Sequence, residues 1–217
     1  MAKNLEIIEQ AIELLKNGLW ANNPDTIKSM LFEFVSQNTG DVKPIKNLSV
    51  WDCTGNDPVR PILQHVFLDH LNKVAVGMDG HIIFINPGEY KVTKSVENGE
   101  VINKDYTEYD DKSCAYPDYH KFIPADDDLE DVNFICVDDI KNFAKQAIVV
   151  ASLSGNETPC IQMVPDNADT LISTRLIPYI LSVGIEGWKR HKKKPMYVKK
   201  FDGKTIALCG IYIPNNE

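Results

Sequence analysis

The sequence lacks the cysteine pairs that mark disulfide-rich and zinc-binding proteins. Its five cysteines are scattered along 217 residues without a C-x-x-C pair, a distribution that is typical of reduced thiols in the cytosol. It also lacks an apolar run approaching ~18 residues, the length at which a membrane-spanning helix becomes plausible. The N-terminal residues contain no signal-peptide core. We therefore expect a soluble, cytoplasmic protein with no membrane partner, no disulfide framework and no zinc site.

Catalytic and cofactor-binding motifs are equally scarce. The five histidines form neither H-x-x-x-H nor H-E-x-x-H, so a metal site has no support from the sequence. There is no G-x-S-x-G nucleophile motif and no glycine-rich phosphate loop. The acidic run at 126–128 lacks the spacing of a calcium loop. We predict a protein that is not an enzyme and binds no cofactor, with a small hydrolase using Asp79 and His81 as a remote alternative.

Positive charge is in the minority, but it is concentrated. Lys and Arg number 23 against 31 Asp and Glu, which gives a net charge of -8 and argues against a surface coated with nucleic acid. Residues 188–200 nevertheless form a dense basic segment. Two interpretations stay open: a solvated strand edge on which lysines discourage aggregation, or a surface that contacts phosphates. The candidate phosphate contacts in this segment are Lys189, Arg190, Lys192, Lys193 and Lys194.

Apolar residues make up 43% of the chain, which is enough for a sizeable core. Helical periodicity covers 5–15, 27–35, 138–148 and 173–181, and extended patterns cover 61–68, 132–137, 160–164 and 170–172. The segment 195–214 is predicted to be a hairpin around Asp202-Gly203. We infer an α+β fold of antiparallel sheets with amphipathic helices packed on one face.

The segment 71–85 places apolar residues on both sides of Asp79-Gly80. Two structures fit this pattern: a buried strand that bends at Gly80 and continues, or a β-hairpin with a polar tip. In either case glycine permits a positive φ, so the bend can present its neighbouring side chains to a ligand.

An acidic stretch at 125–131 is the best candidate for a linker between domains. It separates two units that each contain predicted strands. We therefore predict an N-terminal helix within 1–24, a compressed domain at 25–125 and a second domain at 126–217.

Three separated motifs occur in order along the chain. The first is Pro61-x-Leu63 followed by Val-Gly-Met-Asp79-Gly-His-Ile-Ile83, the second is Tyr116-Pro-Asp-Tyr-His-Lys-Phe-Ile-Pro124, and the third is Leu208-Cys-Gly-Ile-Tyr-Ile-Pro214. Together they resemble the bacterial sliding clamp family (the β subunit of DNA polymerase III). That family has an A-T-D-G-H-R-L turn, an F-P-D-Y-x-x-V-[IL]-P stretch and a C-terminal strand in the same order. The resemblance covers residues 25 to 217 and the family's second and third domains.

The resemblance implies a DNA-clamp-like fold and a replication accessory protein that tethers a partner to duplex DNA without reading its sequence. In the family the same motifs line a pocket that docks a short peptide of replication proteins. Carried over, the pocket residues are Gly80, His81, Ile83, Pro117, Lys121, Phe122, Leu176, Ile211, Ile213 and Pro214. The residues that would face DNA phosphates from helices are Lys141, Lys145 and, more weakly, Arg175. A closed homo-oligomeric ring would need about three chains.

The chain also departs from the family pattern. Only a short segment separates His81 from Tyr116, and the family's first domain has no counterpart. These departures favour an alternative, in which the chain is a clamp-derived interaction module that keeps the fold and the pocket but does not encircle DNA.

Overall fold

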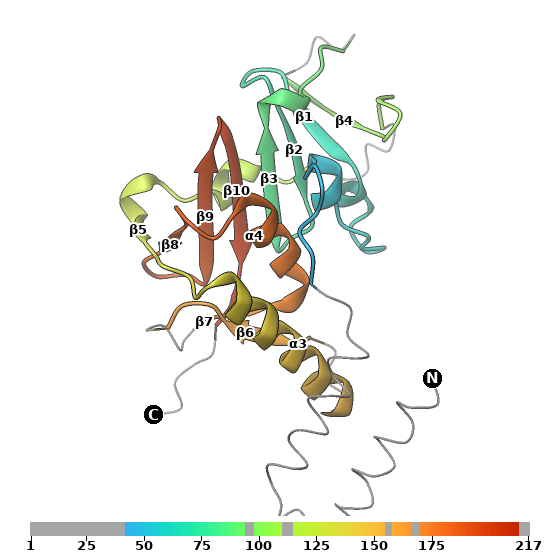
Figure 1. The fold of residues 1–217 in the computed structure, drawn as a ribbon. Coiled ribbons are helices and arrows are strands. Elements are labelled where there is room, and N and C mark those ends of the chain that lie inside the picture. Colours follow the sequence, from blue (N-terminus) through green and yellow to red (C-terminus); the bar gives the residue numbers. More distant parts are fainter. Residues whose placement is uncertain (1–41, 94–97, 110–114, 155–157, 166–169, 213–217) are drawn as a thin grey trace, which may run out of the picture.

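The computed structural model describes residues 42–93, 98–109, 115–154, 158–165 and 170–212 (Figure 1). The predicted helices at 5–15 and 27–35 lie outside this part of the chain, as do Ile213 and Pro214 of the predicted pocket. Within it, two antiparallel sheets combine with two α-helices, which agrees with the expected mixture of helix and antiparallel sheet. No helix in these ranges combines the length and the apolar character needed to cross a bilayer.

The larger sheet has eight strands in the order β4-β1-β2-β3-β10-β9-β8-β5. Every neighbouring pair in it is antiparallel. The strands are β1 (Val66–Asp69), β2 (Val74–Met78), β3 (Ile82–Asn86), β4 (Gly99–Ile102), β5 (Leu129–Asp131), β8 (Lys189–His191), β9 (Met196–Phe201) and β10 (Lys204–Cys209).

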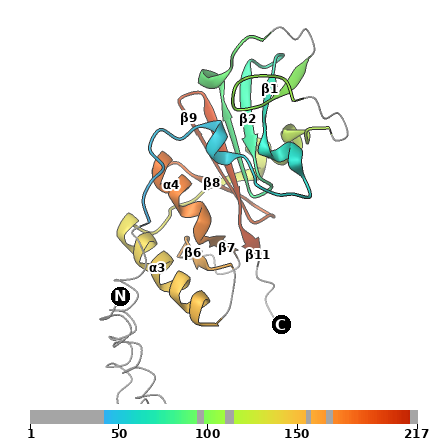
Figure 2. The same ribbon diagram turned by 90° about the vertical axis from the view of Figure 1, so that its right-hand side faces the viewer.

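The smaller sheet has three strands in the order β11-β7-β6 and lies near helix α3 at one end of the molecule (Figures 1 and 2). Its strands are β6 (Cys160–Gln162), β7 (Thr170–Ser173) and β11 (Ile211–Tyr212), and the helices are α3 (Val137–Ser154) and α4 (Ile177–Val183). Because β11 follows β10 after Gly210, the chain passes directly from the larger sheet into the smaller one.

The segment 71–85 is a hairpin, so the polar-tip interpretation is correct and the continuing strand is not. Met78 of β2 pairs with Ile83 of β3, and the Asp79 N–H donates to the Ile82 carbonyl at 3.2 Å. Gly80 has φ of 92°, a conformation that glycine adopts without a Cβ clash.

The predicted Asp202-Gly203 hairpin is also present, between β9 and β10. Both turn residues have positive φ, 48° and 74°, as the tight turns of twisted hairpins require.

Two predicted strands begin elsewhere. The segment expected to be extended from Pro61 starts as a 3-10 helix, Pro61–Gln64, and β1 begins only at Val66. Proline favours the first helical position because its missing N–H needs no partner there. The second predicted strand, at 132–137, is absent from the larger sheet. Instead, β5 at Leu129–Asp131 joins that sheet, although these residues belong to the acidic stretch that was expected to be a linker.

The helices follow their sequence signals in part. Ile140 and Ala144 of α3 are fully buried, whereas Phe143, expected on the same face, is 44% exposed because it lies on the flank of that stripe. Pro178 lies in the first turn of α4 and Gly184 ends that helix. Ser173, expected to cap it, begins the preceding 3-10 helix Thr174–Leu176 and makes no capping hydrogen bond.

One hydrophobic core joins the two halves of the chain. It contains Phe84 from β3, Ile206 from β10 and Ile140 from α3, all at most 1% exposed. The larger sheet is continuous across the predicted boundary at residue 125, because β3 pairs with β10. The division into domains at this boundary remains a prediction.

Candidate functional site

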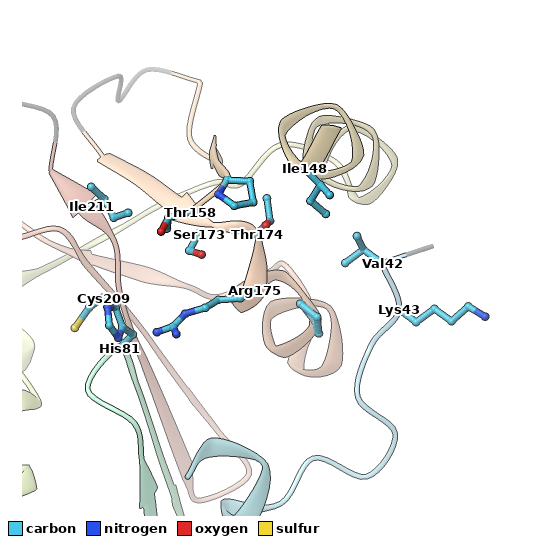
Figure 3. Close-up of a pocket in the computed structure, with 12 residues that line it drawn as sticks. Val42, Lys43, His81, Ile148, Thr158, Ser173, Thr174, Arg175, Cys209 and Ile211 are labelled. Carbon is cyan, nitrogen blue, oxygen red and sulfur yellow. The ribbon is translucent and has the colours of Figure 1, made fainter. Parts of the chain in front are cut away.

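A cavity of about 620 Å³ lies where the tip of the β2–β3 hairpin, the end of β7, β11 and helix α3 meet (Figure 3). These segments are far apart in the sequence but are brought together by the β3–β10 and β7–β11 pairings. The lining residues are Val42, Lys43, His81, Ile148, Thr158, Pro159, Ser173, Thr174, Arg175, Pro178, Cys209 and Ile211.

The cavity wall is largely apolar, with polar groups at a few points. Val42, Ile148, Pro159, Pro178 and Ile211 supply aliphatic surface. Ile211 is 40% exposed, so it offers this surface to a ligand. An apolar wall with a few fixed polar groups is the usual composition of a site that binds a peptide or small molecule.

Asp79 fixes the hairpin tip that carries His81 to the cavity. Its Oδ1 accepts hydrogen bonds from the backbone N–H groups of His81, at 2.7 Å, and Ile82, at 2.9 Å. Its Oδ2 lies 3.6 Å from Nη2 of Arg175. On the other side, the Cys209 N–H donates to the His81 carbonyl at 2.7 Å, which ties the tip to the end of β10.

The surroundings of the His81 ring favour its neutral form. Partial burial lowers its pKa from the usual 6.5, and the nearby Arg175 and Arg60 cations lower it further, while the Asp79 carboxylate acts in the opposite direction. At neutral pH the imidazole therefore offers one hydrogen-bond donor and one acceptor.

The acid/base alternative gains nothing from this arrangement. The Asp79 carboxylate holds two backbone N–H groups and faces Arg175. Among the described residues, no group of three or more His, Cys, Asp or Glu side chains is placed to hold a metal ion. Cys53, Cys136, Cys160 and Cys209 are free thiols, and burial raises the pKa of the Cys209 thiol at the cavity.

Two of the predicted pocket residues, His81 and Ile211, line the cavity, and Gly80 adjoins it in the hairpin tip. Ile83 and Leu176 are 5% and 1% exposed and belong to the hydrophobic core.

Pro117, Lys121 and Phe122 do not line the cavity. They lie in or beside the 3-10 helix Tyr119–Phe122, which is anchored by a 2.7 Å hydrogen bond from the Tyr119 hydroxyl to Asp69. Asp69 pairs with Val74 at the start of β2, so this helix lies toward the opposite end of β2 from Asp79, roughly 16 Å along the strand. Lys121 forms an ion pair with Asp118 at 3.5 Å.

Part of the basic segment is paired with the acidic stretch at 126–131. Arg190 Nε lies 2.5 Å from Glu130, Lys189 Nζ lies 3.8 Å from Asp131, and Lys192 Nζ donates to the Asp127 carbonyl at 2.6 Å. Lys193 and Lys194 are exposed in the loop between β8 and β9. β8 is not the edge of the sheet, because β5 pairs with it on the side away from β9.

The remaining candidate DNA contacts lie nearer the cavity. Lys141 and Lys145 are half-buried and share one face of α3 with Ile148, since the three are spaced at i, i+4 and i+7. The resemblance also implied that Arg175 contacts phosphates. In the structure, Arg175 lines the cavity.

Several lining residues were not predicted from the sequence. The sequence placed Ile148 on the apolar face of a predicted helix but did not predict it in a binding site. Cys209 lies inside the third motif but was not itself predicted to be in the pocket. The other residues not predicted are Val42, Lys43, Thr158, Pro159, Ser173, Thr174 and Pro178, which meet only in the folded chain.

Comparisons with known proteins gave a partial structural likeness and no sequence match. No family model and no curated protein sequence matches the chain. Among solved structures, the chain is similar to the DNA polymerase sliding clamp from Bacillus subtilis, with 13% sequence identity and a TM-score of 0.44. The match covers 85% of this chain but 63% of the clamp, so this chain spans less than two thirds of the clamp's length.

Proposed function

We propose that this protein is a sliding-clamp-like accessory protein that docks a short peptide of a replication partner in the cavity between His81, Arg175 and Ile211. One observation carries the proposal: two sequence-distant segments of the clamp resemblance, the Asp79-Gly80-His81 turn and the C-terminal strand, meet at a single cavity. The apolar wall suits aliphatic or aromatic anchors of a peptide, and the polar groups suit its backbone.

Selection of short random peptides on the immobilised full-length protein tests this proposal. Peptides that dock in the cavity should lose at least about tenfold in affinity to Ile211→Glu, because the substitution places a carboxylate on the apolar wall. The matched control is Val59→Glu, which adds the same charge at a position that is 84% exposed and does not line the cavity. Equal loss in both variants, or no loss in Ile211→Glu, would contradict docking at this cavity.

Tethering to duplex DNA is the second candidate function, and the alignment of Lys141 and Lys145 on one face of α3 favours it. The pairing of Lys189 and Arg190 with β5 favours the alternative, an interaction module that does not encircle DNA. Measurement of mass in solution, with and without nicked circular duplex DNA, separates the two. A tether gives an oligomer retained on circular DNA; a monomer that loads on neither circular nor linear DNA identifies the interaction module.

A further inference from the structure

The cavity has an uneven charge distribution. Its described lining includes two cations, Arg175 and Lys43, but no Asp or Glu. Figure 3 shows that the Lys43 side chain extends away from the cavity, whereas the Arg175 guanidinium extends toward His81 and Cys209. Arg175 is therefore the lining cation that a ligand would meet inside, next to the Asp79 carboxylate.

Within the part of the chain that the structure describes, the Arg175 guanidinium has hydrogen-bond donors available for a ligand. Its guanidinium lies 3.6 Å from the Asp79 carboxylate, a distance longer than a hydrogen bond. Asp79 Oδ1 accepts from two backbone N–H groups, so Oδ2 is the carboxylate oxygen that faces the guanidinium. Arg60, the other guanidinium near the hairpin tip, differs because its Nε lies 2.8 Å from Asp57.

The surroundings of Arg175 favour a carboxylate over a larger anionic surface. Its side chain is 51% exposed, so a ligand can reach the guanidinium, yet aliphatic residues of the wall such as Ile211 and Pro178 lie in the same cavity. A guanidinium binds a carboxylate through paired, charge-assisted hydrogen bonds. The neutral His81 ring adds a donor and an acceptor without adding a second charge.

We infer that Arg175 selects partner peptides that carry an Asp or Glu side chain next to an aliphatic or aromatic anchor. This inference rests on the proposed docking function and specifies the chemistry of the peptide. The anchor packs against the apolar wall, and the carboxylate pairs with the guanidinium. Arg175 is thus the residue that determines specificity, while Ile211 and its neighbours supply affinity that does not depend on charge.

Peptides selected on the full-length protein provide the test. Each acidic peptide is compared with its Asp→Asn or Glu→Gln counterpart on the wild type, on Arg175→Gln and on Lys43→Gln. On the wild type, neutralising the peptide should weaken binding roughly tenfold, the usual effect of removing a charged hydrogen-bond partner. On Arg175→Gln the acidic and neutral peptides should bind equally. Lys43→Gln should keep the preference, because that side chain points away.

The outcomes separate this inference from the proposed function. Peptides that need Ile211 but bind equally well in acidic and neutral forms would overturn the role of Arg175 and leave docking intact. Failure to select any peptide that responds to Ile211→Glu would overturn both. Displacement of the peptide by a short DNA duplex, in a manner that requires Arg175, would assign the guanidinium to phosphate and also overturn the inference.

Discussion

Asp79 links the backbone of the hairpin tip to the charge of the cavity. One carboxylate oxygen accepts from two backbone N–H groups, and the other faces Arg175. The hydrogen bonds from the backbone orient His81. The other carboxylate oxygen lies 3.6 Å from the Arg175 guanidinium, so the two form an ion pair but no short hydrogen bond. A single side chain therefore determines both the shape and the electrostatic character of this corner of the site.

The titration of His81 should report on these neighbours. Arg175→Gln removes a nearby cation, so the pKa of His81 should rise toward 6.5, whereas Asp79→Asn removes the opposing carboxylate and should lower that pKa further. NMR titration of the imidazole signals measures both shifts. Lys43→Gln serves as the control and should leave the pKa unchanged; a shift of the same size in this control would contradict the assignment.

The lowered pKa also fixes how His81 affects stability. Because the pKa of His81 is lower in the folded protein than its usual 6.5, the unfolded chain binds a proton at His81 at a higher pH than the folded protein does. The stability contribution is therefore fully present above pH 6.5 and is lost as the pH falls through the lowered pKa.

Gly77 is required for close packing between β2 and the 3-10 helix Val50–Cys53. A Cβ at this position would lie 1.9 Å from the Val50 carbonyl oxygen. We expect Gly77→Ala to reduce the free energy of unfolding by about 3 kcal/mol, since the backbone must shift.

Gly187→Ala is the matched comparison for this substitution. No atom lies within 4 Å of a Cβ there, and φ is 72°, so only backbone strain of about 1 kcal/mol is expected. Urea denaturation of both variants checks the difference. If both variants lose the same free energy of unfolding, the backbone near Val50 can shift to accept a Cβ at residue 77 without a large loss of stability.

At the scale of elements, local signals identified hairpins but not distant pairings. The Asp202-Gly203 turn was predicted because its residues alone favour a tight turn. The partner of β5 was not predicted, because Glu130 and Arg190 are far apart in sequence and nothing local sets their register. Composition therefore suggested an acidic linker and a basic surface, whereas the fold pairs the two as neighbouring strands.

This pairing predicts that the two groups of cations contribute unequally to DNA association. Lys141→Glu with Lys145→Glu should weaken binding to duplex DNA and reduce its dependence on salt concentration by about one unit of slope per lost phosphate contact. Lys189→Glu with Arg190→Glu should reduce the slope by less than one unit per cation, because Lys189 and Arg190 face the carboxylates of Asp131 and Glu130. Titrations at several salt concentrations measure both slopes. An unchanged slope in the α3 variant would remove these lysines from the candidate contacts.

At the scale of the whole molecule, the two halves of the chain share the larger sheet and the hydrophobic clusters packed on it. β3 pairs with β10, and Phe84 packs in the same core as Ile206 and Ile140. The sequence predicted the separate hairpins and helix α3 from periodicity. It could not predict the cavity, because Val42, Pro159 and Ile211 reach the same place only after the sheets have paired.

Shared packing predicts that the described halves unfold together. Scanning calorimetry should give a single transition whose van't Hoff and calorimetric enthalpies agree, because breaking β3–β10 exposes the core of both halves. The substitution Ile206→Ala, at a site that is fully buried, should lower that one transition as a whole. Two resolved transitions, only one of which responds to Ile206→Ala, would support independent domains at 25–125 and 126–217.

The position of β10 has a consequence for how the chain is completed on the ribosome. This strand lies between β3 and β9 in the middle of the larger sheet, although residues 204–209 are synthesised after both. Until they emerge, the β1–β3 hairpins and β9 have no strand to join them, and both present unpaired edges. The nascent chain thus depends on residues 204–209 to join the two parts of the larger sheet, and the cavity that needs Cys209 and Ile211 forms only after β11 has also been translated.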